Sequence, residues 1–167
     1  MSVFRKGALK SAAVGLAGVS ALLFASPANA APAGVNTYIG NLGTGKCLAV
    51  PGASQTEGTE TVQWGCGSSG QVWEWIPVSS DHWKLRNTAS GQCLAIAGGT
   101  GTNGANAIQW PCGSGSEQVW IWDSAARLRN VASDRCLAVP NSSTANGTKV
   151  VQWTCSTSAD QQWVQVV

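Results

Sequence analysis

Charge and most kinds of aromatic and metal-binding side chain are scarce in this chain. Of its 167 residues only 11% are charged, and it has one histidine, His82, and one tyrosine, Tyr38. Both phenylalanines fall within the first 30 residues, so the nine tryptophans are almost the whole aromatic supply of the remainder. A lone histidine and the lack of any Cys-x-x-Cys pair argue against a zinc site. We therefore expect no metal and no cofactor.

The same scarcity argues against an enzyme. The eight acidic residues show no pairing pattern in the sequence, and His82 has no cysteine free to act with it. Nothing indicates a nucleophile with its base, or the pair of carboxyl groups that glycoside hydrolysis needs. The sequence therefore predicts a protein without catalytic activity.

Residues 1–30 are expected to form a secretory signal peptide. Arg5, Lys6 and Lys10 precede an uncharged, largely apolar run over 12–25, and residues 28–30 read Ala-Asn-Ala, which fits a cleavage site. The apolar run is too short for a convincing membrane span, and no later stretch is long enough to cross a bilayer. We expect a secreted protein without membrane insertion, whose folded domain covers residues 31–167.

Removal of this segment changes the charge balance. Three of the ten basic residues, and none of the eight acidic ones, lie before residue 31, so the rest of the chain is close to neutral. A near-neutral domain has no electrostatic footprint for nucleic acid or anionic lipid. We expect a monomer whose partner is neutral and is recognised by shape and hydrogen bonds.

One 20-residue cassette occurs three times, as CLAVPGASQTEGTETVQWGC at 47–66, CLAIAGGTGTNGANAIQWPC at 93–112 and CLAVPNSSTANGTKVVQWTC at 136–155. Six cysteines in an exported chain indicate disulfides. Of the possible pairings, the repetition selects one bond within each cassette: Cys47–Cys66, Cys93–Cys112 and Cys136–Cys155. Each would close a loop of about 20 residues and stabilise the fold by roughly 3 kcal/mol.

The cassette belongs to a longer unit, with repeats over about 36–80, 81–124 and 125–167. An asparagine stands six residues before each first cysteine, and Gln-x-Trp follows each second cysteine. In the middle unit, β signals cover 82–87, 93–97, 107–112 and 119–124, separated by Gly, Ser, Thr and Asn clusters typical of turns. Internal repeats of this length indicate a fold that is built from repeated structural units. Three units of four strands predict an all-β fold of twelve strands, closed by pseudo-threefold symmetry.

The three Gln-x-Trp motifs, in register with C-L-x-V or C-L-x-I and the paired cysteines, resemble the ricin B-type lectin family over about residues 36–167. The resemblance implies a β-trefoil that binds carbohydrate in shallow pockets, up to one per repeat. The Gln-x-Trp tryptophans, Trp73, Trp120 and Trp163, are predicted to fill the core. Their partners Gln71, Gln118 and Gln161 are predicted to bind loop backbone, because a buried amide needs hydrogen-bond partners.

The resemblance also indicates sites. In sugar-binding members an Asp stands two residues after the first cysteine, an aromatic two before the second, and an Asn before the Gln-x-Trp glutamine. The aromatic matches in all three repeats, but the Asp positions hold Ala49, Ala95 and Ala138, and the Asn positions hold Gly70, Glu117 and Asp160. The third repeat is best equipped and the first is poorest. The candidate carbohydrate-binding residues are Trp153, Asp160, Asn141, Asn146, Gln152, Trp110, Gln109, Asn103, Glu117, Trp64 and Gln63.

Two questions stay open. Each candidate tryptophan directly follows a glutamine, and neighbouring strand residues face opposite sides, so the pair faces one side only if a β-bulge intervenes. This alternation favours packing of Trp64, Trp110 and Trp153 in the core over stacking on a sugar. The second question is function, since a protein-binding trefoil, such as an inhibitor or a toxin's delivery subunit with degenerate sugar sites, is the alternative to a carbohydrate-binding module.

Overall fold

The computed structural model describes residues 34–166, so the predicted signal peptide lies outside the described residues. Twelve short β-strands and six single-turn 3₁₀ helices make up this part of the chain, which contains no α-helix. The prediction of an all-β, twelve-stranded trefoil is confirmed. The strands of the first repeat are β1 (Asn36–Asn41), β2 (Cys47–Ala49), β3 (Val62–Trp64) and β4 (Val72–Pro77).

The other two repeats follow the same order. The second holds β5 (His82–Asn87), β6 (Cys93–Ile96), β7 (Ala107–Trp110) and β8 (Trp120–Trp122). The third holds β9 (Leu128–Asn130), β10 (Cys136–Ala138), β11 (Val151–Trp153) and β12 (Trp163–Val166). The four strand signals of the middle unit thus correspond to β5–β8, with small differences at the ends.

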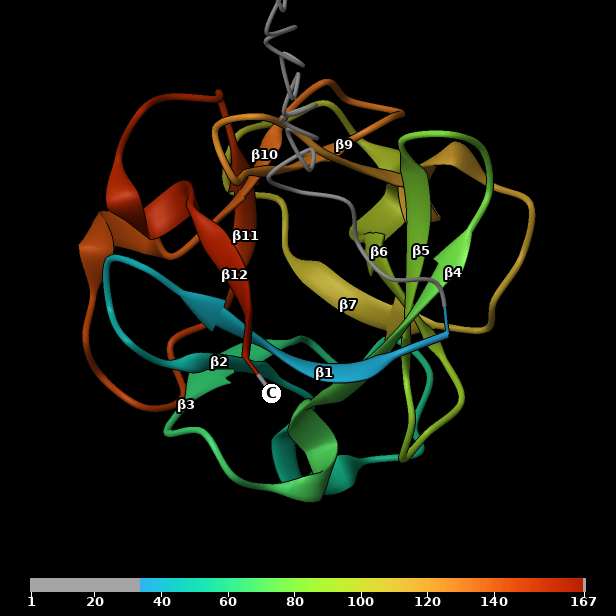
Figure 1. Ribbon diagram of the computed structural model, residues 1–167, viewed down its shortest axis with the longest axis horizontal. Helices are drawn as coiled ribbons and strands as arrows, with labels where there is room; N and C mark the ends of the chain where they lie inside the picture. Colours follow the sequence, from blue (N-terminus) through green and yellow to red (C-terminus); the bar gives the residue numbers. More distant parts are fainter. Residues whose placement is uncertain (1–33, 167) are drawn as a thin grey trace, which may run out of the picture.

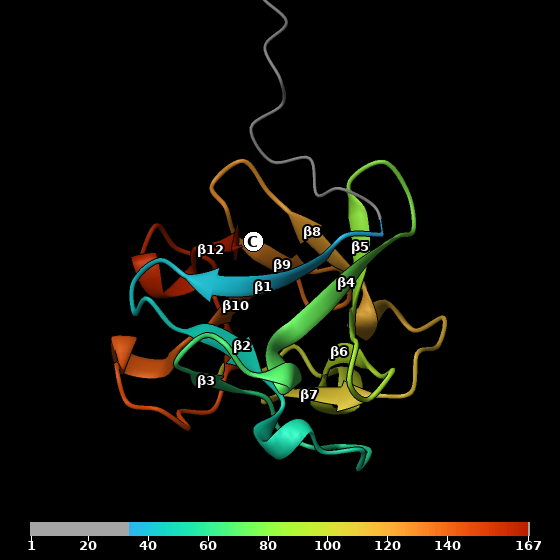
Figure 2. The same cartoon turned by 60° about the horizontal axis from the view of Figure 1, so that its bottom comes forward.

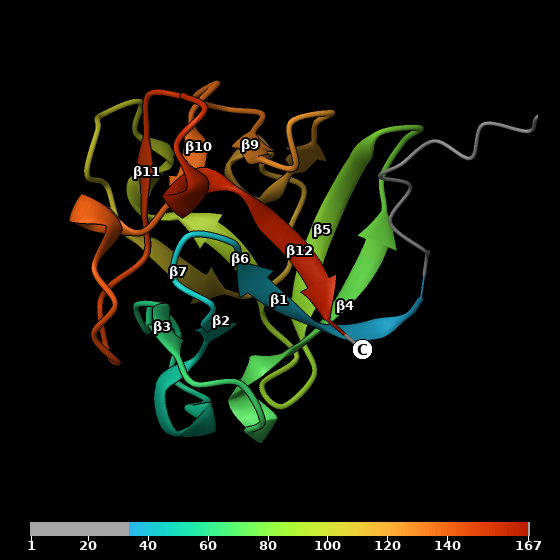
Figure 3. The same ribbon diagram turned by 60° about the vertical axis from the view of Figure 1, so that its left-hand side comes forward.

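Six of the strands form a barrel. Antiparallel pairs run β12–β1, β1–β4, β4–β5, β5–β8 and β8–β9, and a bridge between Arg127 and Gln162 joins the two remaining sides. Figure 1 shows the three repeats arranged around a common centre, and Figure 3 shows β12 lying alongside β1. Closure leaves no free barrel edge for another chain to pair with.

The other six strands form three hairpins, β2–β3, β6–β7 and β10–β11. In the view of Figure 2, the β2–β3 and β6–β7 hairpins lie below the barrel strands β1 and β8. A ring of backbone hydrogen bonds joins the hairpins: Thr61 N donates to Ala107 O, Ala107 N to Val150 O, and Val150 N to Thr61 O, at 2.9, 2.9 and 3.0 Å. Each repeat therefore holds the next one in a closed circle.

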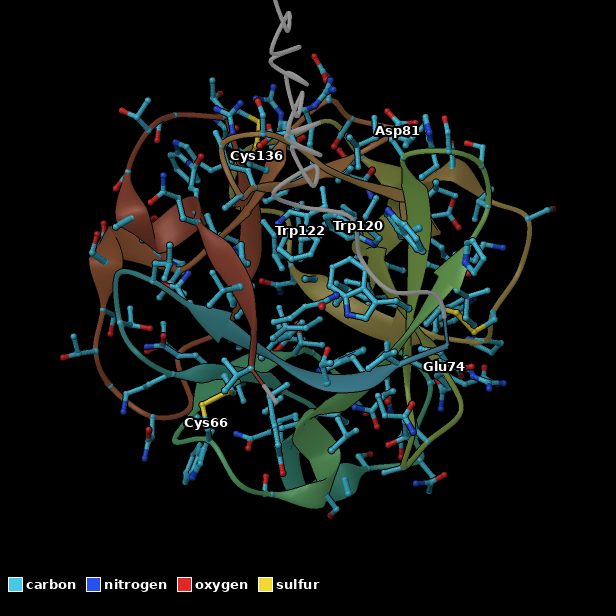
Figure 4. All side chains as sticks on the ribbon, viewed as in Figure 1. Cys66, Glu74, Asp81, Trp120, Trp122 and Cys136 are labelled. Atoms are coloured by element: carbon cyan, nitrogen blue, oxygen red, sulfur yellow. A yellow bond between two sulfur atoms is a disulfide. The ribbon has the colours of Figure 1, made fainter. Side chains whose placement is uncertain are left out.

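The core repeats with the same symmetry. Trp73, Trp120 and Trp163 are at most 1% exposed, and their indole N–H groups donate to the backbone carbonyls of Leu48, Leu94 and Leu137. Figure 4 shows Trp120 pointing into the interior. The prediction of three symmetric core indoles is confirmed. Each donates to its own repeat's cassette, so the residue that fills the centre also fixes the hairpin above it.

A second set of tryptophans packs together beside this core. Trp75 and Trp122 stack with ring centroids 5.0 Å apart, and Trp83 meets Trp75 edge-on at 6.0 Å. The third repeat has Ala126 and Gln165 at the corresponding positions, so the indoles of the first two repeats make up this cluster. Six of the nine tryptophans are thus accounted for by packing.

The three predicted disulfides, Cys47–Cys66, Cys93–Cys112 and Cys136–Cys155, are confirmed, and no cysteine is left free. Each ties the first strand of a hairpin to the turn just after its second strand. Gln71, Gln118 and Gln161 bind that same turn, as predicted. The Gln71 amide, for example, accepts from Gly67 N at 2.8 Å and donates to Gly65 O at 2.8 Å. The turn after the second strand of each hairpin is therefore held both by a disulfide and by the hydrogen bonds of a buried glutamine.

Candidate functional site

Three pockets open at equivalent places, one in each repeat. Each lies between the hairpin, the short turn that follows its first strand, and the turn that carries the Gln-x-Trp glutamine. The volumes are about 390 Å³ in the first repeat, 390 Å³ in the second and 340 Å³ in the third. The walls are mostly apolar, and one tryptophan contributes to each: Trp64, Trp110 and Trp153.

These three indoles are half exposed, at 49%, 45% and 47%. The expectation that they pack in the core is therefore wrong. Each tryptophan and its preceding glutamine do face opposite sides of the strand, as alternation requires. However, the glutamine points inward and the tryptophan points outward, which is the reverse of the arrangement that we favoured. No bulge is needed to present the ring to solvent.

The inward glutamines Gln63, Gln109 and Gln152 are 0% exposed. Each amide donates to two carbonyls in a loop of another repeat; Gln109, for instance, bonds Ser54 O and Thr56 O, both at 2.8 Å. Burial of an amide costs little when the protein supplies its hydrogen bonds. Although these glutamines were expected to contact a ligand, they join neighbouring repeats, and we do not carry them into the proposed site.

Each pocket indole also rests on a glycine of another repeat. A methyl group added at Gly147, Gly58 or Gly104 would lie 3.5 Å from the ring of Trp64, Trp110 or Trp153, respectively. The three glycines have φ of +76° to +82°, a conformation that side chains with a Cβ rarely adopt. One edge of each ring therefore lies close to the glycine backbone of another repeat, while about half of the side chain remains exposed.

The asparagines of the long loops also lie where a pocket tryptophan meets a loop of another repeat. Asn146 accepts a hydrogen bond from Gly65 N at 3.2 Å, and Asn103 accepts one from Thr154 N at 2.8 Å. Each therefore lies beside the tryptophan of a different repeat from its own, and neither is among the residues that line the three pockets. The equivalent place in the middle repeat holds Pro111, which has no N–H to donate, and the loop residue there is Glu57 instead of asparagine.

Other predicted residues do come together. Asn141, Trp153 and Asp160 line the pocket of the third repeat, and Trp110 and Glu117 line that of the second. In the first repeat Trp64 has no acidic neighbour, since Gly70 stands at the corresponding position. Glycine is required there, because a Cβ would lie 2.4 Å from the carbonyl oxygen of Val50.

The alanines that replace the expected aspartate form part of each pocket wall. Ala49, Ala95 and Ala138 are 4%, 2% and 2% exposed and line the first, second and third pockets. They present a methyl group where a carboxylate would accept hydroxyl hydrogen bonds. In the second and third pockets the ionisable group comes instead from the turn before the Gln-x-Trp glutamine.

The sequence pattern predicted only one residue, Asn141, of a wall that recurs in all three pockets. The turns after β2, β6 and β10 are the 3₁₀ turns η1 (Pro51–Ala53), η3 (Ala97–Gly99) and η5 (Pro140–Ser142). Residues of all three line the pockets. The repeated position directly after C-L-x-V or C-L-x-I was the available signal. Its meaning depended on how the turn folds back toward the Gln-x-Trp turn of the same repeat.

Comparison with known protein families identifies the family of this chain. The model of the ricin-type β-trefoil lectin domain matches residues 35–163. The chain belongs to this family of carbohydrate-binding proteins. Within residues 34–166, this lectin has no cluster of three or more His, Cys, Asp or Glu side chains fit to hold a metal ion. The same residues include no helix long and apolar enough to span a membrane.

Solved structures of the same fold include the designed threefold-symmetric protein ThreeFoil, at 29% identity and a TM-score of 0.76, covering 79% of this chain and 98% of that one. The exo-β-1,3-galactanase 1,3Gal43A of Clostridium thermocellum matches at 25% identity and 0.76, covering 81% and 31%. The Rhizoctonia solani agglutinin matches at 20% and 0.72, covering 83% and 97%. This lectin thus spans about a third of the galactanase. No curated protein matches the chain.

Proposed function

We propose that this lectin is a secreted, non-catalytic module that binds glycans in its three pockets. The observation that carries the proposal is the half-exposed indole in each pocket, whose edge packs close to a glycine of another repeat. An indole face suits the apolar C–H face of a pyranose ring, and a few fixed polar groups then orient the hydroxyls. A ring that is already fixed loses little side-chain entropy on binding.

The chemistry of the pockets supports binding without catalysis. Glu117 is the one acidic residue lining the second pocket, Asp160 is the one lining the third, and the first has none. Glycoside hydrolysis uses two carboxyl groups on opposite sides of the bond to be cleaved. A pocket with one carboxylate can accept hydroxyl hydrogen bonds but lacks the second group.

Three similar pockets on one domain imply weak binding at each site and stronger binding to a polymer that engages more than one. The three disulfides fit a protein that works in an oxidising, extracellular setting. The predicted signal peptide over 1–30 and the domain over 31–167 belong to this proposal.

A glycan array of the protein lacking residues 1–30, followed by titration calorimetry of each hit, tests the proposal. Single replacements of Trp64, Trp110 and Trp153 by alanine should each remove one site, and the triple variant should lose binding. Leu42→Ala is the matched control, because Leu42 is 52% exposed and lies outside the three pockets.

Two outcomes would overturn the proposal. A blank across galactosides, xylans and other polysaccharides would favour the alternative of a protein-binding trefoil. A saccharide bound equally well by the triple variant would place the site away from the indoles.

A further inference from the structure

The three pockets occupy equivalent places in the fold, but they differ in the charge of the residues that line them. Glu117 and Asp160 stand at equivalent positions in the turns η4 (Ser116–Gln118) and η6 (Ala159–Gln161). Their backbone carbonyls accept hydrogen bonds from the buried amides of Asn130 and Asn41, both at 2.8 Å. The asparagine of the next repeat therefore fixes the backbone from which each carboxylate extends.

Neither carboxylate is neutralised by a basic side chain of the described residues. Five ion pairs occur there, and they use Glu60, Glu74, Asp81, Asp123 and Asp134. The three remaining acids of residues 34–166 are Glu57, Glu117 and Asp160. Two of these three line a pocket beside a half-exposed indole.

The groups around the two carboxylates leave this charge available. Asp160 accepts a hydrogen bond from the Ser158 hydroxyl, which carries no charge. Near Glu117, the Lys84 ammonium donates to Gly113 O at 2.5 Å in the preceding turn and makes no ion pair with Glu117. The walls supply mostly apolar atoms, including the methyl groups of Ala95 and Ala138.

An uncompensated carboxylate in the same pocket as a half-exposed indole selects for a compact cation. An ammonium group donates charge-assisted hydrogen bonds to the carboxylate, which are roughly twice as strong as those from a neutral hydroxyl. The same cation is attracted to the electron-rich face of a tryptophan ring. A pyranose that carries a free amino group combines this cation with the C–H face that suits the indole. An acidic sugar would be repelled.

We propose that the second and third pockets select amino sugars with a free ammonium group, such as the glucosamine units of chitosan, over their N-acetylated counterparts. The first pocket, which has Gly70 in place of an acid, makes no such distinction. This proposal rests on the proposed carbohydrate binding and specifies the substrate class of two of the three sites.

Calorimetric titration with a glucosamine tetramer and with the N-acetylglucosamine tetramer tests the proposal, since the two probes differ in charge at each 2-amino group. The variants are Glu117→Gln, Asp160→Asn and the double substitution, each of which removes charge with little change of shape. Glu57→Gln is the matched control, because it removes one unpaired charge from outside the pockets.

The wild-type protein should bind the glucosamine tetramer more tightly, and the double variant should lose roughly tenfold in that affinity. Affinity for the acetylated tetramer and the effect of Glu57→Gln should both stay within about twofold. Raising NaCl from about 0.05 to 0.5 M should weaken ammonium binding in the wild type and have little effect in the double variant.

Different failures point to different errors. Equal affinity of the wild type for both tetramers, with binding still dependent on the pocket tryptophans, would overturn the amino-sugar proposal and leave the proposed function standing. The same loss in Glu57→Gln would also overturn it, since the attraction would then be a general field effect. Preference for a lysine-rich peptide over the glucosamine tetramer would overturn it in favour of protein recognition. Absence of binding to any saccharide would overturn the proposed function itself.

Discussion

The buried glutamines that join the repeats give a sharp energetic prediction, because the three equivalent residues do not have equal partners. Gln152 donates to Thr100 O at 2.6 Å and Thr102 O at 3.0 Å, and it accepts from the Ser133 hydroxyl at 2.6 Å. Gln109 makes the two equivalent donations, but its side-chain oxygen is buried without a partner. Gln152 and Gln109 can therefore be compared directly as equivalent residues with different numbers of hydrogen bonds.

Replacement by methionine keeps a linear side chain of similar size and removes the amide. In Gln152→Met three hydrogen bonds are lost, and at about 1 kcal/mol each the free energy of unfolding should fall by roughly 3 kcal/mol. In Gln109→Met two bonds are lost, while one buried oxygen without a partner also disappears. The two effects partly cancel and leave a loss of about 1 kcal/mol.

Urea unfolding of the oxidised protein, followed by tryptophan fluorescence, measures both changes. The difference of about 2 kcal/mol should appear in the midpoints with an unchanged slope, and Gln152→Met should melt roughly 10 °C below the wild type. Gln63 also has three partners, including the Thr44 hydroxyl at 2.8 Å, so Gln63→Met should behave like Gln152→Met. An equal or larger loss in Gln109→Met would refute the reasoning.

Three further predictions use the same unfolding assay. Replacing Cys93 and Cys112 together by alanine should cost about 3 kcal/mol through the 20-residue loop that the bond closes. A reducing agent should cost the wild type more than this, because it opens all three bonds, and should cost the variant only the contributions of the two bonds that it retains. Burial disfavours the charged form of Asp123, but hydrogen bonds from Arg127 outweigh it and hold the Asp123 pKa below its ordinary 3.8. Asp123→Asn should therefore destabilise by about 1 kcal/mol at neutral pH, and the difference should vanish as the pH falls through the folded-state pKa; a difference that persists in acid would contradict this linkage. Gly104→Ala should cost about 1 kcal/mol because φ there is +82°, while Gly104→Asn should cost less; equal losses would point to packing against the indole instead.

Many of the residues that line the pockets could be predicted from the sequence. How they come together, and which way each side chain faces, could not. The match of Trp64, Trp110 and Trp153 to the family's aromatic position correctly indicated pocket residues. Alternation along a strand stated only that each tryptophan and its preceding glutamine face opposite ways. Which one faces inward depends on carbonyls such as those of Ser54 and Thr56, more than 50 residues from Gln109 in the sequence.

The repeated residues along the chain were enough to predict the scaffold: three disulfides within cassettes, three core indoles, three Gln-x-Trp turns and twelve strands. These features are local to one repeat, so spacing and periodicity record them. The contacts between side chains of different repeats became visible only in the folded protein. The buried glutamines, the glycines behind the pocket indoles, and Asn103 and Asn146 all act on a different repeat from their own. Contacts of that kind depend on how the three units close around the axis, and a pattern that looks the same in every repeat cannot show which neighbour each residue serves.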